Sequence, residues 1–104
     1  MVNKYGAKSV EVDGIKFASK REAERYSELK WLEKAGQIRC LDCHPQYELI
    51  VNGKKIGKYT ADFQYYDQEK GFTIEDVKGK ITEAASLRIR LFNALYNTKV
   101  RIIK

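Results

Sequence analysis

Residues 60–79 read T-A-D-F-Q-Y-Y-D-Q-E-K-G-F-T-I-E-D-V-K-G, and this stretch decides the fold. Two runs rich in β-branched and aromatic residues, 59–66 and 72–78, flank the polar segment Asp67–Gly71. This pattern predicts a β-hairpin with a loop of about five residues.

The length of that loop sets which residues face each other across the hairpin. A loop over residues 67–71 places Asp62 opposite Asp76. Because side chains alternate between the two faces of a strand, Lys78 shares a face with Asp76, and Glu75 points to the other face. A loop of four or six residues would instead set Asp62 opposite Glu75 or Val77, and a slip of one residue reverses every face. With the loop at 67–71 we expect the carboxylates of Asp62 and Asp76 to lie close enough to share one cation.

Two carboxylates and an ammonium group then meet at one end of the hairpin. Like charges that face each other across a sheet are destabilising unless a positive charge lies between them. A divalent cation would supply that charge. The alternative is a solvated polar patch on a hairpin that is exposed on both sides.

The composition favours a polyanionic partner. The chain has 104 residues, with 20 lysines and arginines against 14 aspartates and glutamates, and a net charge of +6. Such a balance is typical of nucleic-acid binding, although many basic proteins bind none.

No apolar run reaches membrane-spanning length and no signal peptide starts at Met1, so we expect one cytoplasmic domain over residues 1–104. Residues 1–8 are basic and lack apolar periodicity, which predicts a loose arm.

A smaller hairpin and a helix are predicted before this central stretch. Residues 9–17 alternate apolar and polar types around the dipeptide D-G at 13–14, a strong hairpin signal. Ser19 then fits the N-cap of a helix, with Glu22 three residues later as in a capping box. Gly36 is expected to end this helix.

Glu22 is the informative residue of the first helix. It lies at i, i+4 and i+7 with Tyr26 and Leu29, so it continues the apolar stripe instead of the polar face. The rest of the stripe is predicted at Leu32 and Ala35. A solvated ladder of charges is predicted on the outer side, formed by Arg21, Glu24, Arg25 and Glu28. Glu22 could simply complete the capping box, or it could also face a site.

Strands and a second helix account for most of the remaining chain. Residues 38–41 and 47–51 predict short strands separated by a turn at 42–45, and the dipeptide N-G at 52–53 predicts a turn into the strand that carries Asp62. A helix is predicted over 82–96 and a last strand over 100–103. The apolar face of the second helix is wide, so we expect it to be well covered; it consists of Ala84, Ala85, Leu87, Ile89, Leu91, Phe92 and Leu95.

The segment Cys40-Leu41-Asp42-Cys43-His44 matches the C-x-x-C-H pattern of covalent haem attachment. The chain has no other histidine, and its one methionine is Met1. A zinc site would need four ligands, and this segment offers three. We therefore expect neither haem nor zinc, and reduced cysteines.

Taken together, the order of elements and three short motifs resemble the PD-(D/E)xK nuclease superfamily, and most closely a family of small phage and prophage proteins within it. The motifs are S-K-R-E-A-E-R-Y at 19–26, A-D-F at 61–63 and I-E-D-V-K-G at 74–79. The resemblance implies an α+β domain of the restriction-endonuclease-like type. Its α-β-β-β-α-β core would have a mixed central sheet flanked by helices, with an N-terminal β-hairpin added in this chain.

The resemblance also implies roles for individual residues. Asp62 takes the place of the superfamily's aspartate on its second strand, Asp76 and Lys78 take the places of its D/E-x-K pair, and Glu22 that of its first-helix glutamate. Asp62, Asp76 and Glu22 would bind Mg²⁺, for which Mn²⁺ could substitute. Lys78 would orient or deprotonate the attacking water. Ala61 stands where the superfamily usually has the proline of the motif.

The implied activity is hydrolysis of DNA phosphodiester bonds by a Mg²⁺-dependent endonuclease in phage DNA metabolism, within a bacterial host. The small size favours structure-selective cutting of branched or distorted duplexes, as by a Holliday-junction resolvase or a nicking enzyme, and a homodimer could make paired cuts. Phosphate contacts are expected from Arg21, Lys80 and Arg88. The alternative is a phage DNA-binding or host-inhibiting accessory protein with the same fold and no catalysis.

Overall fold

The structure is a computed structural model that describes residues 9–104, so the arm expected at residues 1–8 lies outside the described residues. Between the two helices lie five strands, where the sequence analysis expected four. The elements in chain order are β1 (Val10–Val12), β2 (Ile15–Phe17), α1 (Lys20–Lys34), β3 (Ile38–Cys43), β4 (Gln46–Val51), β5 (Lys54–Thr60), β6 (Phe63–Asp67), β7 (Gly71–Val77), α2 (Glu83–Tyr96) and β8 (Arg101–Ile103).

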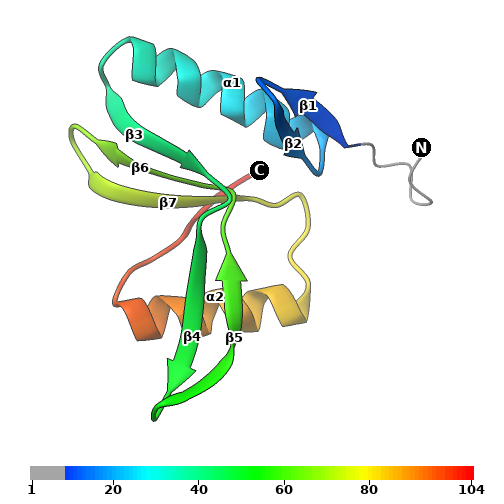
Figure 1. Ribbon diagram of the computed structural model, residues 1–104, viewed down its shortest axis with the longest axis vertical. Helices are drawn as coiled ribbons and strands as arrows, with labels where there is room; N and C mark the ends of the chain where they lie inside the picture. Colours follow the sequence, from blue (N-terminus) through cyan, green and yellow to red (C-terminus); the bar gives the residue numbers. More distant parts are fainter. Residues whose placement is uncertain (1–8) are drawn as a thin grey trace.

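A mixed four-stranded sheet forms the centre of the molecule, in the order β3-β6-β7-β8, with β7 and β8 parallel and the other pairs antiparallel. Helix α1 and the β1–β2 hairpin lie against one side of this sheet, and α2 lies on the other side behind the β4–β5 hairpin (Figure 1). The predicted α+β class, with two helices on a mixed sheet and an N-terminal hairpin, is confirmed.

The register of the β6–β7 hairpin agrees with the sequence-based prediction. Gln64 pairs with Ile74, and Tyr66 pairs with Phe72. Pairing also continues to Asp67 and Gly71, so the open part of the loop is shorter than the predicted segment. Gly71 has a φ of 80°, which suits a short hairpin loop that ends in a left-handed glycine.

The strand predicted to run from the 52–53 turn to Asp62 is instead two strands, β5 and β6. Strand β5 pairs with β4 in a separate two-stranded sheet, and β6 joins the central sheet. The chain bends between them at residues 61–62, opposite a second bend at His44 and Pro45 between β3 and β4. The backbone N–H of Ala61 donates to the carbonyl of Pro45 at 3.1 Å, which keeps the two bends aligned. A long antiparallel ribbon therefore changes sheets at one point, and Asp62 lies at that point.

Helix α1 buries a shorter stripe than the sequence suggested. Its buried residues are Ala23, Tyr26 and Leu29, whereas Leu32 is 36% exposed and Ala35 is exposed. The N-cap at Ser19 is confirmed, because its hydroxyl accepts from the backbone N–H of Glu22 at 3.1 Å. The buried stripe packs on residues of β2, β3, β6 and β7, which belong to one cluster: Phe17, Ile38, Phe63, Tyr65 and Val77.

Only half of the wide apolar face of α2 is covered, contrary to expectation. Ile89 and Phe92 are buried against a second cluster that includes Ile74 of β7. Leu87 and Leu95, on the other half of that face, are 63% and 39% exposed. The small β4–β5 hairpin and the sheet together contact only one side of the helix.

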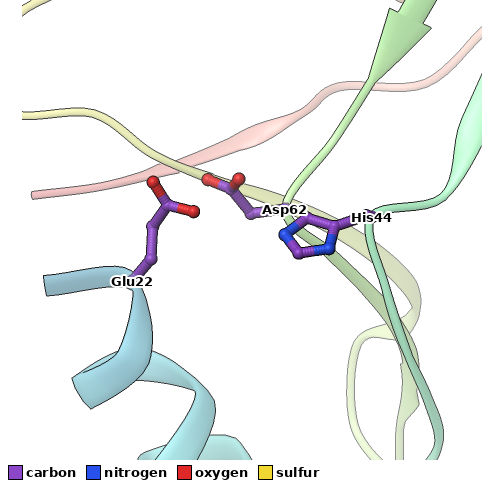
Figure 2. Close-up of side chains that lie close together, drawn as sticks. All are labelled: Glu22, His44 and Asp62. Atoms are coloured by element: carbon purple, nitrogen blue, oxygen red, sulfur yellow. The ribbon is translucent and has the colours of Figure 1, made fainter. Parts of the chain in front are cut away.

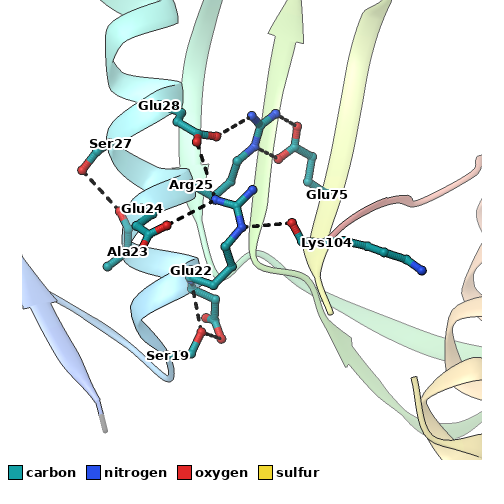
Figure 3. Close-up of polar contacts among 10 residues, drawn as sticks. Ser19, Glu22, Ala23, Glu24, Arg25, Ser27, Glu28, Glu75 and Lys104 are labelled. Carbon is teal, nitrogen blue, oxygen red and sulfur yellow. Dashed lines mark hydrogen bonds and ion pairs between the residues drawn. The ribbon is translucent and has the colours of Figure 1, made fainter. Parts of the chain in front are cut away.

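Arg25 was predicted on the solvated outer face of α1, and this is wrong. Its guanidinium makes a bidentate ion pair with Glu75, at 2.8 Å from Nε to Oε1 and 2.6 Å from Nη2 to Oε2 (Figure 3). Glu75 is fully buried and also accepts a hydrogen bond from the hydroxyl of Tyr65. The hydrogen bonds to Glu75 raise the pKa of Arg25 well above its ordinary value. A carboxylate on β7 therefore draws Arg25 back toward the sheet, because a buried charge must be paired.

We expect Arg25→Ala to destabilise the fold by about 3 kcal/mol, since it leaves the buried Glu75 carboxylate without its partner. The matched control is Arg21→Ala, because Arg21 makes ion pairs with Glu24 and Glu28 that are about half exposed. Such exposed pairs contribute about 1 kcal/mol or less. Urea denaturation of both variants measures the difference. Equal losses of unfolding free energy would contradict a structural role for the Arg25–Glu75 pair.

Candidate active site

Asp62 occupies the bend between β5 and β6 and contacts three other segments. Its backbone N–H donates to the carbonyl of Glu75 at 3.1 Å, and its carbonyl accepts from the backbone N–H of His44 at 2.9 Å. Its side-chain Oδ2 accepts from the backbone N–H of Val77 at 2.7 Å. These contacts hold the carboxylate at the edge of the central sheet, beside β7.

The side chain of Asp76 lies on the face of β7 that looks toward α2. It is 1% exposed, and it accepts a hydrogen bond from the hydroxyl of Tyr59 on β5. Burial raises the pKa of Asp76 to about 6, although the bond from Tyr59 acts in the opposite direction. The negative charge of Asp62 contributes to the rise, because it repels the ionised form of Asp76. The effect of Asp62 on the pKa of Asp76 agrees with the predicted register, and the sharing of one cation by the two carboxylates stays a prediction.

The pKa of Asp62 is also raised. Burial is the main cause, and the negative charge of Glu22 adds to it, while the N–H of Val77 lowers it. Lys78 offsets part of the repulsion at both aspartates. The three carboxylates of Glu22, Asp62 and Asp76 therefore carry more negative charge than Lys78 can neutralise.

A pocket of about 410 Å³ opens beside Asp76, between β5, the end of β7 and α2. Lys78 and Arg88, both predicted to act at the site, line it with Asp76. Lys58 also lines it, so three basic side chains surround a buried carboxylate. The other lining residues are Tyr59, Thr60, Ala85 and Ile89.

Glu22 approaches Asp62 from the first turn of α1, as its position on the inner stripe predicted. Figure 2 shows the carboxylates of Glu22 and Asp62 with the imidazole of His44 beside them. One ligand atom from each of the three side chains lies within 4.8 Å of the other two.

The remaining predicted residues lie outside this group. Glu75 points to the α1 side of the sheet and is held by Arg25, as the register requires. Arg21 lies on α1, where its Nε donates to the backbone oxygen of Lys104 at 3.0 Å. Lys80 is exposed in the segment between β7 and α2 and is not among the residues that line the pocket.

Two residues near the site were not identified from the sequence. Tyr59 lies in the strand before Asp62, but the bend that turns it toward Asp76 was not predicted. His44 was considered only with its neighbouring cysteines. Neither cysteine belongs to the group of Glu22, His44 and Asp62. Cys40 is exposed, and burial raises the pKa of the partly buried Cys43 thiol to about 11. The signal for His44 was its position between two predicted strands. It lies next to Asp62 because β3 pairs with β6 and β4 pairs with β5.

The chain matches the family model described as "Protein of unknown function (DUF1064)" over residues 2–104. The protein belongs to the DUF1064 family. No curated protein and no solved structure matches the chain. Neither helix of this DUF1064 protein, within the residues described, is long and apolar enough to cross a membrane.

The donor set of this DUF1064 protein fits a divalent cation. Asp62 and Asp76 provide hard carboxylate oxygens, the type of ligand that Mg²⁺ and Mn²⁺ prefer. Both carboxylates have a raised pKa, because burial and mutual repulsion penalise their charged forms. A bound cation would relieve that repulsion, so cation binding and ionisation of the pair favour each other.

Asp76 should make the metal-free protein less stable as the pH rises. Its pKa of about 6 in the folded chain exceeds the ordinary value of 3.8, so between these pH values the folded state holds a proton that the unfolded state has lost. The associated stability is present below pH 4 and is lost as the pH rises through 6. Over this range we expect Asp76→Asn to gain on the order of 2–3 kcal/mol in unfolding free energy relative to the native sequence.

Chemical denaturation at pH 4, 5, 6 and 7.5 in EDTA measures this difference. Asp67→Asn is the control, because backbone N–H groups hold the pKa of this partly buried carboxylate at the end of β6 below its usual value. Its pH dependence should therefore have the opposite sign. If the unfolding free energy of Asp76→Asn changed with pH in parallel with that of the native sequence, the raised pKa of Asp76 would be contradicted.

Proposed function

We propose that this protein is a divalent-cation-dependent endonuclease that hydrolyses phosphodiester bonds in DNA. The observation that carries the proposal is the buried Asp76 carboxylate in a pocket lined by Lys58, Lys78 and Arg88, with Asp62 near enough to raise the pKa of Asp76. An accumulation of negative charge is unfavourable in a protein that binds a polyanion, unless a cation is held there as part of the chemistry.

The charges around the pocket suit a phosphate backbone. Lys58, Lys78 and Arg88 surround its opening, whereas Asp76 is buried within it. The basic side chains would bind flanking phosphates, and the net charge of +6 would favour approach to DNA over longer distances. Binding should therefore weaken as salt concentration rises. Arg21 and Lys80 could contact phosphates farther from the scissile bond.

Each side chain has a distinct part in the proposed reaction. Asp62, Asp76 and Glu22 would hold Mg²⁺, with Mn²⁺ able to replace it, and Tyr59 would fix the orientation of the Asp76 carboxylate through its hydroxyl. The bound cation would polarise the scissile phosphate and lower the pKa of the attacking water. The Nζ of Lys78 would orient that water or accept its proton, and would offset charge that develops on the phosphate in the transition state.

Branched or distorted DNA is the substrate class that we favour. Within residues 9–104 the helices and strands belong to one fold, which includes no separate module that would read base sequence. Structure-selective cutting by a junction resolvase or a nicking enzyme needs no such module, and a homodimer could place two pockets for paired cuts. The setting we propose is phage DNA metabolism in the cytoplasm of a bacterial host.

A non-catalytic DNA-binding or host-inhibiting accessory protein is the competing proposal. It would use the same basic residues but would have no need for Asp62 and Asp76. Substitution of the aspartates therefore separates the two proposals. In an accessory protein, Asp76→Asn would leave function unchanged or improve DNA binding by removing a negative charge.

We expect the purified protein to cut or nick DNA in Mg²⁺ or Mn²⁺ and to be inactive in EDTA. The substrates are supercoiled plasmid, linear duplex and a four-way junction, and the junction should be cut fastest. Asp76→Asn and Lys78→Met should each lower the cleavage rate by about 100-fold or more, because each removes a charge that acts on the transition state.

Lys70→Met is the matched control for Lys78→Met, because Lys70 is an exposed lysine at the opposite end of the same hairpin. Its cleavage rate should equal that of the native sequence. If the protein binds DNA yet leaves all three substrates intact with either metal, the accessory proposal is the correct one. Circular dichroism establishes that each variant remains folded.

A further inference from the structure

Glu22, His44 and Asp62 form a second group of metal-binding side chains on the α1 side of the site (Figure 2). They come from three separate segments, namely the first turn of α1, the bend between β3 and β4, and the bend between β5 and β6. Their ligand atoms lie within 4.8 Å of one another. Two ligands of one ion lie at most about 4.3 Å apart, so small side-chain rotations would bring all three into the coordination sphere.

The fold holds each member of this group in place. The imidazole of His44 packs on the ring of Phe17, with the ring centroids 5.7 Å apart. The backbone N–H of His44 donates to the carbonyl of Asp62 at 2.9 Å, which fixes the spacing of these two residues. Glu22 is positioned by its backbone bond to the Ser19 hydroxyl at the helix N-terminus. The arrangement therefore does not depend on a flexible loop.

The ring nitrogens of His44 make no hydrogen bond with any residue that the structure describes, so one of them is available as a ligand. Imidazole nitrogen distinguishes this group from the aspartate pair, because Mg²⁺ prefers oxygen ligands and first-row transition metals bind nitrogen well. We propose that Glu22, His44 and Asp62 form a subsite for a divalent first-row transition-metal cation, which shares Asp62 and Glu22 with the proposed Mg²⁺ site.

The subsite rests on the proposed function, because it would give the same site a second cation that prefers a nitrogen ligand. Asp62 and Glu22 would be common to the two positions, with Asp76 and Lys78 on one side and His44 on the other. Metal binding is measured without DNA, so the subsite can be tested whether or not the protein proves to be a nuclease.

The test is calorimetric titration of the full chain with Co²⁺ and, separately, with Mg²⁺. We expect His44→Asn to weaken Co²⁺ binding by about tenfold or more, because even indirect partners of a metal ligand contribute that much. Its Mg²⁺ affinity should change by less than about threefold, because the oxygen ligands remain. Asparagine is chosen because His44 has a φ of 55°, a conformation that asparagine tolerates well.

Two further variants serve as controls. Asp42→Asn removes an exposed carboxylate two residues from His44, and it should leave Co²⁺ affinity within about threefold of the native value because Asp42 is not a ligand. Asp76→Asn should abolish the proposed cleavage while His44-dependent Co²⁺ binding persists. The two proposals can therefore fail separately.

Equal Co²⁺ affinity in the native protein and His44→Asn would overturn the subsite, as would an equal loss of Co²⁺ and Mg²⁺ binding. If His44→Asn does not fold, the native protein still decides the question. His44 is the only histidine of the chain, so its side-chain ¹⁵N signals are assigned without ambiguity. Addition of Zn²⁺, a diamagnetic probe, should shift one ring nitrogen strongly. Ring signals that do not move would show that His44 is not a ligand.

Discussion

Three hydrogen bonds to Asp62 hold the point where the β-ribbon leaves the central sheet. Its carbonyl binds the bend at His44, its N–H binds the carbonyl of Glu75, and its carboxylate accepts from Val77. The β4–β5 hairpin can then turn toward α2, which forms the pocket beside Asp76. A regular strand through residue 62 would keep the ribbon in one sheet. Asp62 would then no longer lie between Asp76 on the α2 side and Glu22 and His44 on the α1 side. The bend therefore positions both the fold's second layer and its candidate ligands.

Glu75 and Asp76 are adjacent buried carboxylates with opposite surroundings. Glu75 is neutralised by a bidentate Arg25 and by Tyr65, so its charge is fully accounted for within the fold. Asp76 has only a tyrosine hydroxyl and a nearby lysine, and it faces a second carboxylate. In a purely structural strand, an apolar residue would be more stable than Asp76 at this position. This contrast is the reason why Asp76, and not Glu75, is proposed as a metal ligand.

The sequence was sufficient for the features that depend on local periodicity. The loop composition at 67–71 predicted the register of β6 and β7, and with it the orientation of Glu75 away from Asp76. Features that depend on distant contacts were missed. The bend at residues 61–62 requires a partner bend at 44–45, and Arg25 turns inward because of a carboxylate far along the chain. His44 was missed for the same reason, and helix periodicity alone could not show that half of the α2 face lacks a covering element.

The central claim is that Asp62 and Asp76 together hold a divalent cation. Crystals grown with Mn²⁺, measured with X-rays near the manganese absorption edge, test it most directly. If the two aspartates share the cation, an anomalous peak is expected within about 2.2 Å of carboxylate oxygens from both, with Glu75 still bound to Arg25. A peak at Glu75, or ordered aspartates with no peak between them at saturating Mn²⁺, would contradict it.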